Sequence, residues 1–164
     1  MAMNYTPDHI RDLIQFGEHT EFEVMESGRA LPKDVWPTYS SFANTRGGTI
    51  ILGIKEDKSK PREERFEIVG VPDPQKILTE LWSNLSNPQK VSRNLLTESN
   101  VQLLPIDGMN VICIDVPEAD YRQNPIYLHG DMVKHSYKRT YEGDTHLTED
   151  DLKNMLRDAD DEGR

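Results

Sequence analysis

The sequence contains little of several features that mark whole classes of protein. It has one cysteine, Cys113, in 164 residues, so no disulfide can form within the chain, as is usual in a reducing compartment. No stretch approaches the roughly 20 apolar residues that a membrane-spanning helix needs, and residues 1–12 lack the basic and apolar regions of a secretory signal. We therefore expect a cytoplasmic protein with no membrane partner.

Motifs of common enzyme classes are also missing. The sequence has no glycine-rich loop ending in Gly-Lys-Ser/Thr for nucleotide phosphates, no serine nucleophile elbow, and no histidines at the spacing of a zinc site. Basic residues are few: 19 Lys and Arg stand against 29 Asp and Glu, a net charge of −10. Because Lys and Arg neutralise bound phosphates, this charge argues against indiscriminate binding to nucleic acid. We expect no cofactor.

The sequence does contain alternating helical and strand patterns, which predict an α+β domain over residues 1–156. A polar tail over 157–164 would start a link to further domains. Apolar residues three or four apart predict helices, each opened by a capping residue, and short apolar runs predict a mixed, largely antiparallel sheet. The predicted helices begin at Thr6-Pro7, Asp34, Asp73-Pro74 and Thr148, and the predicted strands are 20–24, 49–54, 66–71, 101–106, 111–116, 126–128 and 136–139.

The segment Ser41–Ile54 (SFANTRGGTIILGI) is the most distinctive part of the chain. It predicts the end of an amphipathic helix, a sharp turn at Gly47-Gly48, and a buried central strand over 49–54, because glycine permits positive φ and β-branched runs favour strands. The glycines leave a helix rather than open one. Since phosphates bind at helix N-termini, a structural turn is favoured here over a phosphate-binding loop.

This segment resembles the central motif of the Schlafen Alba-like domain, in the pattern Phe42-Ala43-Asn44-Thr45-x-Gly47-Gly48-x-Ile50-x-Leu52-Gly53. Four further stretches resemble the same family in the same order and extend the resemblance over residues 14–156. They are GEHTEFE at 17–23, VICIDVP at 111–117, PIY at 125–127, and YKR at 137–139 with EGD at 142–144. One departure is Glu23, where the family commonly has lysine.

The resemblance implies a bacterial DNA-binding or ATP-binding domain at the N-terminus of a transcriptional-regulator-like or helicase-like protein. Asn44, Gly47 and Gly48 would form its structural motif. Residues 134–141 interleave cations with tyrosines, a pattern that suits phosphates and unpaired bases. Equally, those tyrosines can pack and the cations can pair with the acidic residues of 142–151. Under the nucleic-acid interpretation the phosphate contacts are Arg46, Lys134, Lys138 and Arg139.

Two alternatives stay open. Some Schlafen proteins are ribonucleases that use two glutamates and one aspartate, which the resemblance places at Glu18, Glu21 and Asp57; carboxylates of this kind bind Mg²⁺ or Mn²⁺. The two glutamates are closer together here than in nuclease members, so we expect no metal site, no catalysis and a solvated acidic edge strand. The second alternative is a non-catalytic scaffold that forms a homodimer, which the net charge favours.

Overall fold

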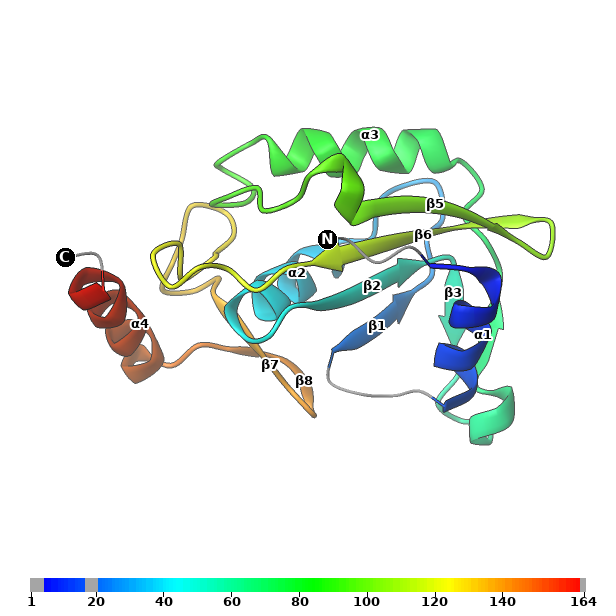
Figure 1. Cartoon of the computed structure of the whole chain (residues 1–164), viewed down its shortest axis with the longest axis horizontal. Helices are drawn as coiled ribbons and strands as arrows, with labels where there is room; N and C mark the ends of the chain where they lie inside the picture. The colour runs from blue at the N-terminus through cyan, green and yellow to red at the C-terminus, as the bar shows by residue number, and fades with distance from the viewer. Residues whose placement is uncertain (1–4, 17–20, 163–164) are drawn as a thin grey trace.

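The computed structural model describes residues 5–16 and 21–162, and its centre is a four-stranded mixed sheet (Figure 1). The strand order is β1-β2-β6-β5; β1 and β2 are parallel, and the other neighbours are antiparallel. Two separate hairpins, β3-β4 and β7-β8, flank it. The strands are β1 Phe22–Met25, β2 Gly48–Leu52, β3 Ile54–Glu56, β4 Phe66–Ile68, β5 Val101–Ile106, β6 Met109–Val116, β7 Tyr137–Thr140 and β8 Gly143–His146. The predicted α+β class and mixed sheet are confirmed.

Helices cover both faces of this sheet. Apolar side chains of β2 alternate between the two faces, so both faces need to be covered. Ile50 and Leu52 join the core under α2 and α3, whereas Ile51 joins a second core with Ile10 of α1. In Figure 1, α3 runs beside β5 and β6, and the β7-β8 hairpin lies at the opposite side of the molecule, next to β1. The helices are α1 Pro7–Phe16, α2 Val35–Asn44, α3 Pro74–Leu85 and α4 Glu149–Glu162.

The predicted helix starts are confirmed, and most of them are capped by their own side chains. The Asp73 carboxylate accepts a hydrogen bond from the Lys76 amide (3.3 Å). Thr148 and Asp151 form a reciprocal capping box, at 3.0 and 2.9 Å. Asp34 precedes α2 as predicted but makes no side-chain cap bond, because its backbone is already helical. These starts are predictable because a cap involves residues only a few positions apart.

Several elements differ from the prediction, including the strand expected over 66–71, which ends at Ile68. The strand expected over 49–54 is divided at Gly53, whose φ of +106° turns the chain so that β3 pairs with β4 instead of extending β2. Residues 126–128 form only isolated bridges. Strand β8 was not predicted, since Gly143–His146 is polar and becomes a strand only by pairing with β7. Residues 157–162, expected to be a tail, continue α4.

The turn between α2 and β2 depends on glycine for two different reasons. Gly47 has φ +75°, and its amide donates to the Phe42 carbonyl (2.7 Å) to close the helix end. Gly48 does not have the positive φ that its place in the motif suggested. It is instead crowded, because a Cβ there would lie 2.8 Å from the Phe42 ring and 2.8 Å from the Glu21 carbonyl.

Candidate functional site

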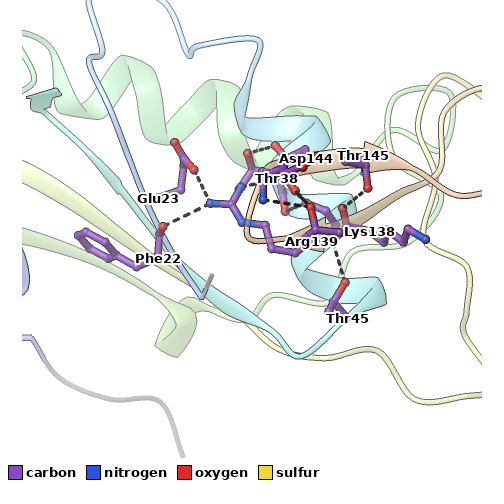
Figure 2. A network of polar contacts seen from close by, with 12 residues as sticks. Phe22, Glu23, Thr38, Thr45, Lys138, Arg139, Asp144 and Thr145 are labelled. Carbon is purple, nitrogen blue, oxygen red and sulfur yellow. Dashed lines mark hydrogen bonds and ion pairs between the residues drawn. The ribbon is translucent and has the colours of Figure 1, made fainter. Parts of the chain in front are cut away.

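Arg139 on β7 is the centre of a polar network that joins three separate parts of the fold (Figure 2). Its guanidinium forms ion pairs with Glu23 on β1 (2.5 Å) and Asp144 on β8 (2.8 Å), and its backbone amide donates to the Thr45 hydroxyl (2.8 Å). The guanidinium also lies over the Phe42 ring, 5.0 Å from its centre. The network therefore fixes the β7-β8 hairpin against β1 and the end of α2.

Helix α2 holds the other side of this network. The Asp144 carboxylate accepts hydrogen bonds from the hydroxyls of Thr38 (2.6 Å) and Ser41 in addition to its ion pair. Burial lowers the pKa of Arg139, but its bonds to Glu23 and Asp144 outweigh burial and raise that pKa above its ordinary value. Arg139 is therefore a permanent cation whose charge is balanced inside the protein.

Asn44, the last residue of α2, connects the same helix to the chain that follows the sheet. Its amide nitrogen donates to the carbonyls of Ile126 (2.9 Å) and Tyr137 (3.0 Å), and its amide oxygen accepts from the Ile126 amide (2.8 Å). The side chain is buried. These bonds satisfy backbone groups of Ile126, which lies outside the named strands, and the Tyr137 carbonyl at the start of β7, which gives Asn44 a structural task.

Two of the cations expected to bind phosphate are engaged within the protein. The Arg139 side chain is only 9% exposed and lies between two carboxylates, so it is not presented to solvent as the phosphate contact expected from the sequence. Lys138 lies 3.0 Å from the Asp151 carboxylate, although more than a third of its side chain is exposed. Hydrogen bonding to the Thr148 amide, followed by bonding to Lys138, lowers the pKa of Asp151. The Arg139–Asp144 and Lys138–Asp151 ion pairs are of the kind expected under the alternative interpretation, in which the cations pair with the acidic residues of 142–151.

The other two cations are exposed. Lys134 lies in the loop before β7. Arg46 lies in the α2-β2 turn, makes no hydrogen bond or ion pair with another described residue, and lines a cleft of about 180 Å³ together with Glu21 and Arg139. This cleft adjoins the edge strand β1.

A larger cleft, of about 290 Å³, is also lined by Arg139 and lies between β1, the β3-β4 hairpin and the tip of the β7-β8 hairpin. Lys58, Phe66 and Tyr141 line it, and Lys58 is exposed without a hydrogen bond or ion pair to a described residue. Lys58 was missed because it stands in a mixed-charge segment that is typical of a solvated turn. Only the pairing of β3 with β4 places it beside Arg139.

The carboxylates expected for a metal are only partly described. Glu18 lies outside the described residues, and Glu21 is exposed in the smaller cleft. The Asp57 carboxylate accepts bonds from the hydroxyl (2.6 Å) and amide (3.0 Å) of Ser59, which lower its pKa. Within residues 5–16 and 21–162, no group of three or more His, Cys, Asp or Glu side chains is placed to hold a metal ion.

The part of the chain that the structure describes contains no helix with both the length and the apolar character needed to cross a membrane. A search of curated proteins finds no match to the sequence. The structure is similar to the solution NMR structure of the N-terminal domain of a protein from Nitrosomonas europaea that is related to the ATP-dependent DNA helicase RecG. The two share 28% sequence identity over 77% of this chain and 81% of that chain, with a TM-score of 0.62.

The family model described as Schlafen, AlbA_2 matches residues 18–148 of the sequence. The match spans the glycine turn, the Arg139 network and both clefts. The motif at 42–53, the mixed sheet and this match agree, and the chain belongs to the Schlafen AlbA_2 family.

Proposed function

We propose that this domain binds nucleic acid along the outer side of β1, with Arg46 and Lys58 contacting phosphates. The observation that carries the proposal is the placement of these two exposed cations in two clefts that Arg139 also lines. Family membership and similarity to a domain of a DNA-helicase-related protein support the same function. In a longer protein, the domain would hold a regulator or a helicase-like enzyme on DNA.

The acidity of the chain limits how such binding works. With a net charge of −10, the protein as a whole repels a polyanion. Locally, Glu23 and Asp144 are paired with Arg139, so these carboxylates repel a phosphate less than unpaired carboxylates would. We therefore expect few phosphate contacts, and a log–log dependence of affinity on salt with a slope of roughly −2 to −4, since each contact contributes about one.

Binding titrations with single- and double-stranded DNA and RNA at several salt concentrations test the proposal. Arg46→Gln and Lys58→Gln should each weaken binding and reduce the salt slope by about one. The matched control is Lys76→Gln, which removes the same charge from α3, beside β5 and β6 at the opposite edge of the sheet from β1 (Figure 1). Absence of binding by the unmodified protein at low salt, or an equal loss in the control, would overturn the proposal.

We expect binding without cleavage. The ribonuclease alternative needs Glu18, Glu21 and Asp57 to share a Mg²⁺ or Mn²⁺ ion, whereas the Asp57 carboxylate is directed to Ser59. Incubation of the protein with labelled RNA and DNA in Mg²⁺ or Mn²⁺ should leave the substrates intact. Cleavage that disappears in both Glu21→Gln and Asp57→Asn would make the enzyme the better interpretation.

A further inference from the structure

The tip of the β7-β8 hairpin presents a large aromatic side chain to solvent. Tyr141 is 89% exposed, whereas Tyr137 on the same hairpin packs against His146 with ring centres 4.5 Å apart. Water contact over most of a tyrosine ring forgoes the burial that usually stabilises aromatic residues. The ring of Tyr141 therefore adds little to the fold and is available to a ligand.

The hairpin that carries this ring is held firmly. Arg139 joins one strand to β1, and Asp144 joins the other to α2 through Thr38 (Figure 2). At the tip, the Thr140 hydroxyl accepts from the Glu142 amide (3.2 Å). A ring on an anchored turn loses little freedom on binding, which favours its use as a contact surface.

The cleft beside Tyr141 suits a planar, uncharged group. Two cations and three carboxylates line it, and one cation, Arg139, is paired with one carboxylate, Glu23. The cleft as a whole therefore has no excess of positive charge. Lys58, which also lines it, is the phosphate contact proposed above, and the remaining surface is left for an uncharged group. Phe66 and Tyr141 supply aromatic surface within its volume of about 290 Å³.

We propose that Tyr141 stacks on an unpaired base, which makes single-stranded nucleic acid the preferred ligand of this domain. The inference rests on the proposed function and deepens it. In a duplex, neighbouring bases cover the faces of each base, so only an unpaired base can stack on a side chain. Stacking on an aromatic residue tolerates any base, so the preference is for strand state rather than for sequence.

The test compares Tyr141→Ala, Tyr141→Trp and the control Tyr121→Ala, which truncates another exposed tyrosine that does not line the cleft. Tyr141→Ala should reduce affinity for single-stranded DNA and RNA about tenfold and leave duplex affinity within about twofold. Tyr141→Trp should retain binding, because the larger ring also stacks. Tyr121→Ala should bind like the unmodified protein, and all variants should keep its melting temperature.

Two outcomes overturn the inference while leaving nucleic-acid binding intact. One is that Tyr141→Ala binds single strands as tightly as the unmodified protein, while Arg46→Gln binds them more weakly. The other is an equal loss for single strands and duplexes, which would make Tyr141 a general contact. A protein that binds no nucleic acid at low salt overturns both the inference and the proposed function.

Discussion

Two turns meet at Arg139, and they serve opposite purposes. In the α2-β2 turn, Asn44 and Gly47 are buried and bonded to distant parts of the chain. At the tip of the β7-β8 hairpin, Tyr141 is exposed, and a Cβ added at Gly143 would meet nothing within 4 Å. The more recognisable motif therefore builds the fold, and the less recognisable turn leaves exposed the ring that we propose contacts a ligand.

The difference has a physical cause. Backbone groups buried at the α2-β2 turn need particular partners, so few residue types satisfy the position and the pattern is easily recognised. An exposed tip is constrained only by its own turn geometry. If this division is right, substitutions in the first turn should change stability, and substitutions in the second should change binding alone.

The largest effect is expected from Asn44→Ala. It removes three hydrogen bonds of 2.8 to 3.0 Å and leaves backbone groups of Ile126 and Tyr137 without them. Buried groups left unpaired each cost about 1–3 kcal/mol, so the free energy of unfolding should fall by about 4 kcal/mol. Thermal and urea denaturation measure it, with exposed Asn154→Ala as the control. A loss no larger than in the control would contradict a structural role for Asn44.

Gly47→Ala should rank next, and it separates two sources of strain. Gly47 has φ +75° and a Cβ there would lie 2.7 Å from the Val116 carbonyl oxygen, whereas Gly108 has φ +77° and nothing within 4 Å. Gly108→Ala should cost about 1 kcal/mol from backbone conformation alone. Gly47→Ala should cost about 3 kcal/mol, because overpacking is added. Equal losses in urea denaturation would show that crowding at this turn is unimportant.

Arg139→Gln tests the two ion pairs that hold the β7-β8 hairpin against the rest of the fold. It leaves the carboxylates of Glu23 and Asp144 without their cation, and Asp144 is the more enclosed, with 19% of its side chain exposed against 31% for Glu23. Because both can still contact water, we expect a loss of about 2 kcal/mol, below the value for a fully buried pair. Arg122→Gln breaks an exposed Arg–Asp pair and is the control. Similar melting temperatures for the two variants would contradict a stabilising role for the Arg139 ion pairs.

The smallest effect is expected from Asp151→Asn, which loosens the outer side of β7 at Lys138. The Asp151 pKa is lowered from 3.8 in the folded protein, so its charge stabilises the fold above that pH. This contribution should disappear as the pH falls through the lowered pKa. Asp151→Asn should therefore melt slightly below the unmodified protein at pH 7, with a difference that narrows below about pH 4. Asp150→Asn is the control, and a gap that is independent of pH would refute the assignment.

Local signals account for what could be predicted. Thr148 and Asp151 are three residues apart, and Asp107-Gly108 alone sets the turn between β5 and β6, with φ of +52° and +77°. Capping and tight turns depend on such neighbours, so their patterns survive in the sequence. Strand β8 and the division at Gly53 were missed, because pairing with a partner elsewhere decides both.

The sequence by itself determined the family, the helix starts and the glycine turn, because each depends on neighbouring residues and on a motif kept in order along the chain. Only the tertiary structure decided that Arg139 would be enclosed, by bringing Glu23 and Asp144 to it from 116 and 5 residues away. The same folding placed Lys58 and Tyr141 around one cleft. Charge pairing depends on distance in space, which composition and spacing along the chain do not specify.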